Sequence, residues 1–278
     1  MGSFPWRALL ANRQVRHGAC LGLLVTGLAL AGPWLAPHGT SELLGPVYGA
    51  PTINAPLGYD YLGHDVLSRV LAGGWSVVWM ALAAALLALL AGGGLGLLAG
   101  FSRGPLDRLL LWSADVSLAF PELILVSLVV SLLGREPWLI VLTVAFAFLP
   151  GMIRQTRAST RAVVEQEFIE VMRAMGLPGW HLALREVLPN ILTALLVHVG
   201  SMLTWAIGIL SGLSFLGYGV APPAADWGLM ISENQAGLAL QPWAVLAPAL
   251  LIGVFAYASN MLAEGIGRVR AGITEQVP

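Results

Sequence analysis

Residues 75–101 read WSVVWMALAAALLALLAGGGLGLLAGF and carry no charge; the nearest charged residues on either side are Arg69 and Arg103. A helix of this length is about 40 Å long, enough to cross the hydrocarbon core of a bilayer. A helix is expected because backbone groups exposed to lipid must satisfy their hydrogen bonds within the segment. This stretch therefore predicts a membrane-spanning helix.

The rest of the chain has the same character. Of its 278 residues, 57% are hydrophobic and only 10% are charged, whereas a soluble domain carries about 25% charged residues. We therefore predict an all-α membrane protein with six transmembrane helices, over residues 18–36, 75–101, 109–133, 137–153, 191–216 and 243–263. The first run could instead be a secretory signal, but its apolar part is longer than the roughly 7–15 residues of such a signal. We expect a retained helix.

Four glycines, Gly92, Gly93, Gly94 and Gly96, interrupt the apolar run of residues 75–101. Small residues in a membrane-spanning helix let a neighbouring helix approach closely. We therefore expect these glycines to serve helix packing rather than to bind a ligand.

The basic residues are unevenly distributed along the chain. If the N-terminus is cytoplasmic, only Arg69 and Arg135 of the fourteen arginines lie outside. The positive-inside rule then predicts that both termini are cytoplasmic. The predicted organisation is a cytoplasmic tail (1–17), a first transmembrane helix (18–36), an extracytoplasmic segment (37–74), a core (75–266) and a second cytoplasmic tail (267–278).

Sequence signatures of enzymes are missing. The chain has no phosphate-binding loop, no HExxH, no dinucleotide fingerprint and no metal-ligand spacing. The single cysteine, Cys20, excludes a disulfide within the chain. The net charge of −1 argues against a nucleic-acid partner. We expect no enzyme activity, no cofactor and no metal site, so any ATP must be hydrolysed by another chain.

The segment between the fourth and fifth spans, residues 165–190, is too polar to enter lipid. It reads EQEFIEVMRAMGLPGWHLALREVLPN. Phe168, Val171, Met172 and Met175 recur at the spacing of one face of a short helix. An amphipathic helix on the cytoplasmic side is therefore predicted here.

A second helix is expected to follow directly. Gly176 tolerates the left-handed backbone that stops the first helix, and Pro178 suits the first turn of the next one. That helix should end by about Leu188, because Pro189 disfavours helix at the residue before it. The product is a helix-turn-helix, which either couples to a partner or lies against the base of the protein itself.

Several stretches together carry a family resemblance. They are FIEVMRAMG (168–176) with REVLPN (185–190), LGYDYLGHDVLSRVL (57–71), LDRLLLWSADVSLAFPEL (106–123) and SFLGYGVAPPAADWGLMI (214–231). In this order they resemble the permeases of binding-protein-dependent ABC importers, in the dipeptide/oligopeptide/nickel branch, and the second permease of the pair. The chain departs from the family at Val171 and Met172, where small residues are usual, at Glu264, where Asp is usual, and after Gly267.

The resemblance implies the transmembrane domain of a type I ABC importer, with cytoplasmic coupling helices, in the bacterial inner membrane. The implied partners are a homologous permease, two ATP-binding-cassette ATPase subunits and an extracytoplasmic solute-binding protein. In the family, the second short helix of the loop lies in a cleft of the ATPase and transmits its closure. The implied coupling residues are Glu170, Arg173, Gly176, Leu177, Pro178, Gly179, Trp180, His181 and Pro189.

Polar residues within the spans are candidates for the pathway or the gate. Asp115 and Glu122 are acids within the third span, where ionisable groups are rare and functional by default. Their spacing of seven residues would place them on one helix face. His198 in the fifth span and Asn260, where such permeases usually have Asn, complete the set. Structural roles remain the alternative for each of them.

The outer segment of residues 217–242 is expected to dock a binding protein and to form part of the outer gate. Pro222 and Pro223 stiffen it, and Asp226 and Trp227 offer a charge and a large amphipathic side chain. Alternatively, Trp227 anchors at the lipid interface.

The cargo remains open at this stage. Peptides are the first expectation, and nickel or a metal chelate, including opine-like compounds, is the alternative within the same architecture. A stand-alone secondary transporter is a remote alternative, because no inverted repeat is evident.

Overall fold

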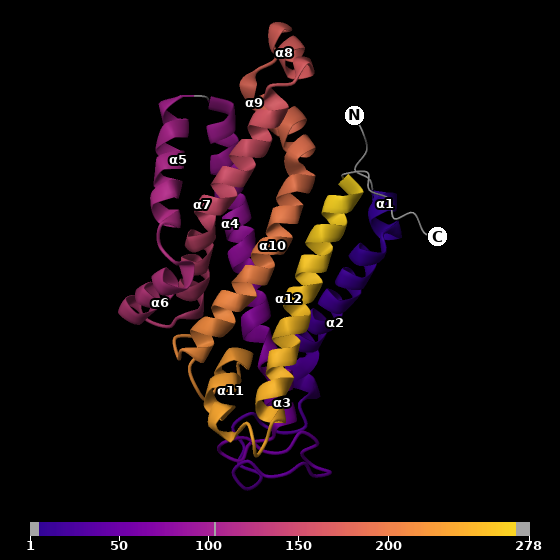
Figure 1. Ribbon diagram of the computed structural model, residues 1–278, viewed down its shortest axis with the longest axis vertical. Helices are drawn as coiled ribbons and strands as arrows, with labels where there is room; N and C mark the ends of the chain where they lie inside the picture. The colour runs from indigo at the N-terminus through magenta and orange to yellow at the C-terminus, as the bar shows by residue number, and fades with distance from the viewer. Residues whose placement is uncertain (1–5, 103, 271–278) are drawn as a thin grey trace.

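The computed structural model describes residues 6–102 and 104–270. Within these residues the chain is helical, and no strand is among its regular elements. Long helices run side by side along the molecule (Figure 1). The elements are α1 (Trp6–Ala11), α2 (Arg13–Leu35), α3 (Val66–Ala72), α4 (Gly74–Ser102), α5 (Pro105–Leu118), α6 (Glu122–Leu133), α7 (Pro137–Val164), α8 (Glu167–Ala174), α9 (Gly179–His181), the π-helix η1 (Leu182–Val187), α10 (Leu188–Phe215), α11 (Trp227–Asn234), the 3₁₀-helix η2 (Gln235–Gly237) and α12 (Trp243–Arg270).

The number of membrane spans agrees with the sequence. In the described part of the chain, five helical segments are long and apolar enough to cross a membrane, and α5 with α6 makes a sixth if the pair is counted as one. The predicted all-α membrane fold is confirmed.

The third predicted span, residues 109–133, is not one helix. α5 ends at Leu118 and α6 begins at Glu122, with an angle of 85° between them. Pro121 stands directly before α6 with an extended backbone, and a proline both lacks the N–H that would continue the helix and disfavours helix at the residue before it. The expectation that Asp115 and Glu122 share a helix face is therefore wrong.

The helix α2 is part of the bundle. It begins at Arg13, earlier than the predicted residue 18, because Asn12 caps it by accepting a hydrogen bond from the N–H of Val15 at 3.1 Å. Val25 and Ala29 are fully buried in the main hydrophobic cluster. This packing, chiefly against α12, is what a retained helix requires.

The helix pair with the most extensive contact is α4 with α7. A Cβ on Gly96 would lie 2.6 Å from the Cβ of Thr156, and one on Gly92 would lie 2.8 Å from a side chain of α7. The predicted packing role is confirmed for these two glycines. At Gly94 no atom of the described residues lies within 4 Å of the Cβ position, and Gly93 has only ordinary contacts, so neither serves close packing within this part of the chain.

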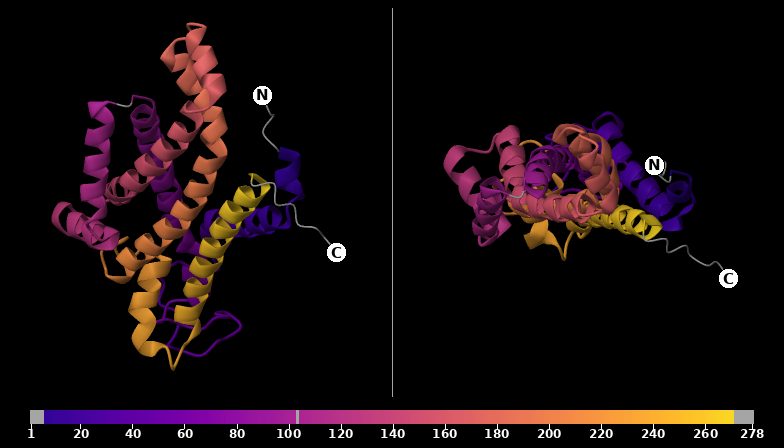
Figure 2. Two further views of the ribbon diagram at one scale, coloured as in Figure 1. Left: turned by 45° about the horizontal axis from the view of Figure 1, so that its top comes forward. Right: turned by 90° about the horizontal axis from the view of Figure 1, so that it is seen from above.

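Both ends of the bundle carry additional structure. α7 continues to Val164, past the predicted limit of residue 153, and α10 begins at Leu188. Between them α8, α9 and η1 form a hairpin that projects beyond the other helices (Figure 2). At the opposite end, the long connection between α2 and α3 gathers with α3 and α11 (Figure 1). The second tail, predicted for 267–278, is helical to Arg270, and its remainder lies outside the described residues.

Candidate functional site

The hairpin of residues 165–190 is anchored at its base. Ile169 of α8 is fully buried in a small hydrophobic cluster whose other members include Leu97, Met152, Val187, Ile191 and Leu195. The guanidinium of Arg173 lies over the ring of Phe101, 5.7 Å from its centroid, a distance typical of a cation–π contact. These contacts fix the hairpin to the ends of α4, α7 and α10.

The turn of the hairpin is as predicted. Gly176 has φ +85°, in the left-handed region. Its N–H donates to the carbonyl of Arg173 at 3.0 Å, and the N–H of Leu177 donates to the carbonyl of Met172 at 3.3 Å. These are the two bonds of a Schellman motif, which a glycine at this position favours. Pro178 follows as the extended N-cap of α9, so the angle between the two halves is set locally.

The second helix does not end by Leu188, and this prediction is wrong. α9, η1 and α10 are continuous, and the N–H of Leu188 donates to the carbonyl of Ala183, five residues back. Pro189 has no N–H for the usual bond to the carbonyl four residues back, and its ring would clash there in an α-helix. The wider π-helical turn removes this conflict without a kink large enough to end the helix.

The outer face of the hairpin is apolar. Met175 is 76% exposed, Trp180 64% and Leu184 53%, and Val171, from the predicted apolar face, is exposed too. Of the other predicted coupling residues, Glu170, Arg173, Pro178, Gly179 and Pro189 are exposed, while Leu177 and His181 are partly covered. Exposed apolar side chains rimmed by charges are typical of an interaction surface.

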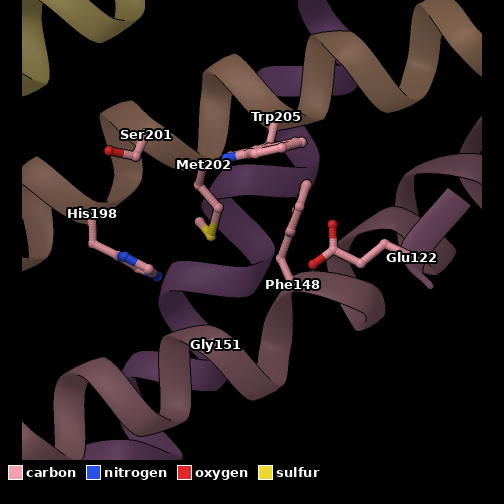
Figure 3. Close-up of a pocket in the computed structure, with 7 residues that line it drawn as sticks. All are labelled: Glu122, Phe148, Gly151, His198, Ser201, Met202 and Trp205. Carbon is pink, nitrogen blue, oxygen red and sulfur yellow. The ribbon is translucent and has the colours of Figure 1, made fainter. Parts of the chain in front are cut away.

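Two of the predicted pathway residues, Glu122 and His198, line the same cavity. The volume of the cavity is ≈ 330 Å³. It is lined by Glu122 of α6, by Phe148 and Gly151 of α7, and by His198, Ser201, Met202 and Trp205 of α10. Figure 3 shows the side chains of Glu122 and His198 entering it from opposite sides. Its size is within the range of small-molecule sites.

The other two pathway candidates lie elsewhere. Asp115 forms an ion pair with Arg154 at 3.0 Å in which both side chains are more than half exposed. Asn260 is exposed and donates to Glu264 at 2.9 Å, one turn further along α12. Neither residue lines this cavity.

An ion cluster near the hairpin end was not predicted from the sequence. Asp107 of α5 is buried and accepts hydrogen bonds from Arg157 and Arg161 of α7. The bond from the Nη2 of Arg157 measures 2.9 Å. The cluster joins the first half of the broken span to α7. The available signal was the pair Asp107–Arg108 within a family-like stretch, but it does not reveal the partners.

The opposite end is closed by a buried ionic network. Arg69 of α3 donates to Asp60 at 2.5 Å and to Glu233 of α11 at 2.9 Å. His64 lies 2.9 Å from the same Asp60, and Tyr61 donates to Glu233 at 2.9 Å. The network joins two polar residues of the stretch 57–71, Tyr61 and Arg69, to α11.

Two acids of this network, Asp60 and Glu233, share the single arginine Arg69. Burial alone raises the pKa of Asp60, but hydrogen bonds from His64 and from the N–H of Leu62, with the Arg69 charge, hold it below its ordinary value. Burial has the largest effect on the pKa of Tyr61 and raises it, and the hydrogen bond to Glu233 raises it further. We call this set the outer network, after the predicted outer segment that contains Glu233: Asp60, Tyr61, His64, Arg69 and Glu233.

The predicted docking residues divide into two pairs. Pro222 and Pro223 are exposed, but Asp226 and Trp227 are buried. Trp227 donates from its indole N–H to the carbonyl of Val70 at 2.8 Å. Asp226 caps α11 and accepts from Ser76 at 2.6 Å, while burial raises its pKa. In this conformation these two side chains join α11 to α3 and α4.

The described residues thus form a helical bundle with a cavity among its predicted spans and an exposed hairpin at one end. The chain belongs to the family of binding-protein-dependent transport system inner membrane components, which matches residues 92–269. It is therefore an inner-membrane permease component of a multi-component transport system, and not a transporter that acts alone.

Individual relatives match nearly the whole chain. A di/tripeptide transport system permease protein, DppC, of Pseudomonas aeruginosa is 33% identical over 94% of this chain and 88% of its own length. A glutathione transport system permease protein, GsiD, of Escherichia coli is 32% identical over 94% and 87%. GsiD of Pectobacterium atrosepticum is 29% identical over the same shares.

Proposed function

We propose that this chain is a permease subunit of an ATP-driven importer of peptides, and that it works with a second permease, two ATPase subunits and an extracytoplasmic binding protein. The hairpin of residues 165–190 is the observation that carries the proposal. Its base packs against α4, α7 and α10, yet Met175 and Trp180 are exposed. A helix that lay against the protein's own base would bury these two side chains. Peptide cargo is supported by the names of the relatives. Those names do not favour nickel or a metal chelate.

In this proposal the apolar side chains of the hairpin enter the ATPase, and Glu170 meets basic residues at the rim. Closure of two ATPase subunits would then move the hairpin as one body. A rigid hairpin suits this task, because a flexible one would absorb the motion.

Docking of the ATPase is tested by changing the exposed surface only. Met175→Glu and Glu170→Lys are each expected to weaken ATPase binding by about tenfold, since a partly desolvated contact contributes about 1–3 kcal/mol. Binding is measured by titrating the ATPase onto the purified permease complex in nanodiscs.

The matched control is Glu42→Lys. It makes the same change of charge at an exposed residue of the opposite end and should leave ATPase binding unchanged. Wild-type affinity in both hairpin variants would contradict the coupling role.

The orientation of the chain is also part of the proposal. The hairpin end would face the cytoplasm and the outer network the other side, in agreement with the arginine distribution. Exposed Pro222 and Pro223 would then be open to a binding protein.

Single cysteines test this orientation in a Cys20→Ser background. Ala224→Cys and Ala174→Cys are both at exposed positions. In spheroplasts, Ala224→Cys is expected to react with a membrane-impermeant maleimide, and Ala174→Cys only after lysis. The opposite labelling pattern would reverse the proposed topology, and Cys20→Ser alone supplies the background signal.

A further inference from the structure

The cavity in Figure 3 has a chemical character that the transport role alone does not require. Most of its wall is apolar or aromatic, with Phe148 and Met202 buried and Trp205 largely exposed. Glu122 brings a carboxylate into this wall, and among the described residues it has neither a hydrogen-bonding partner nor an ion pair. By contrast, Asp115 of the same broken span is paired with Arg154.

An unpaired acid at membrane depth is costly and is retained where it binds something. Glu122 is in the first turn of α6, where the helix dipole complements a negative charge. The break at Pro121 therefore holds a carboxylate at the edge of the cavity, and no cation of the described chain neutralises it. A positively charged ligand could therefore pair with Glu122.

We propose that Glu122, with the rings of Phe148 and Trp205, binds a primary ammonium group of the cargo, the amino terminus of a peptide, during translocation. An ammonium group forms an ion pair with the carboxylate and is also attracted to an aromatic face. Every linear peptide with an unmodified amino terminus carries this group, whatever its side chains. One such site therefore accepts peptides of many sequences. This inference rests on the proposed function.

The first test compares a tripeptide with its N-acetylated form, which lacks the ammonium charge. Initial transport rates are measured for the complete complex in proteoliposomes, with saturating binding protein. Any preference of the binding protein is the same for all variants, so the change in the ratio of the two rates reports on the permease. Glu122→Gln is expected to lower the ratio of free to acetylated peptide by about fivefold or more.

Two further variants keep this result specific. Glu122→Asp retains the charge and should retain most of the selectivity. Asp115→Asn removes an acid from the same broken span outside the cavity and should leave the ratio at its wild-type value. A Glu122→Gln complex that assembles normally and keeps the wild-type ratio would overturn the proposal. So would equal losses for both peptides.

The second test needs neither a binding protein nor transport. Ser201, which lines the cavity, is replaced by cysteine in the Cys20→Ser background. Its reaction rates with aminoethyl methanethiosulfonate, a primary ammonium, and with neutral methyl methanethiosulfonate are compared. Glu122→Gln is expected to reduce the preference for the ammonium reagent by about threefold or more; an unchanged preference would overturn the site.

The two tests separate the site from the function. If the wild-type complex carries neither peptide, the proposed peptide cargo is wrong, and the labelling result still decides whether Glu122 attracts an ammonium group. If the binding protein delivers only the free peptide, the ratio of the two transport rates cannot be measured. The cysteine labelling result alone then tests the site.

Discussion

Arg69→Met is expected to destabilise the protein by about 3–5 kcal/mol, because removing one partner of a buried ion pair leaves the other charge uncompensated. Here two carboxylates are affected, since Arg69 pairs with Asp60 and with Glu233 of α11. All three side chains are buried or nearly so. We expect a large fall in the unfolding temperature of the purified protein, and proteolysis of the segment before α3 at lower protease concentration.

Arg135→Met is the matched control. Arg135 is an exposed arginine that donates to the carbonyl of Gly217 at 2.9 Å, and its loss should shift stability by about 0.5 kcal/mol or less. Combining Arg69→Met with Asp60→Asn and Glu233→Gln should recover part of the loss, because the uncompensated charges are then absent. Unfolding of Arg69→Met at the wild-type temperature would show that the outer network does not hold α11 in place.

Gly96→Val is expected to destabilise the α4–α7 pair by about 3 kcal/mol. Even the first carbon of the new side chain would lie 2.6 Å from the Cβ of Thr156 and 2.7 Å from the carbonyl oxygen of Ile153. These atoms belong to a buried part of α7, so the two helices must separate. The unfolding temperature is measured in detergent, with the yield of folded protein as the readout.

The control for this prediction lies two residues away. Gly94→Val makes the same change of helix propensity, but no atom lies within 4 Å of its Cβ position. It should therefore unfold close to the wild-type temperature. If both variants lose the same stability, the close contact at Gly96 does not account for the effect.

Local features were predictable from the sequence. The spans follow from uncharged runs, and the turn at Gly176 follows from a short helix that ends in Met-Gly-Leu-Pro. Both depend on residues only a few positions apart. The errors were local too: Pro121 breaks a span that hydropathy treats as continuous, while Pro189 is absorbed into a π-helical turn. Proline alone does not tell which of these outcomes the neighbouring residues favour.

The arrangement of the candidate sites could not be predicted in the same way. Arg69 and Glu233 are 164 residues apart in the chain, and Glu122 and His198 come from different helices. Both acids of the third span were candidates for the pathway or the gate from the sequence. The break at Pro121 separates them, because Asp115 on α5 pairs with Arg154 of α7, whereas Glu122 on α6 lines the cavity. Likewise, the sequence of the outer segment does not reveal that Pro222 is exposed whereas Trp227 is buried.

The π-helical turn before Pro189 has a mechanical consequence. Because it preserves the helix, residues 179–215 form one unbroken rod of 37 residues, about 55 Å long. His198 to Trp205 lie in its middle portion and line the cavity, and its far end is Phe215, beside the outer segment. No loop interrupts this helical segment between the hairpin and the residues that line the cavity. A displacement of the hairpin would therefore tilt the wall of the cavity on α10 directly, while the wall at Glu122 belongs to α6, which is not part of the base of the hairpin.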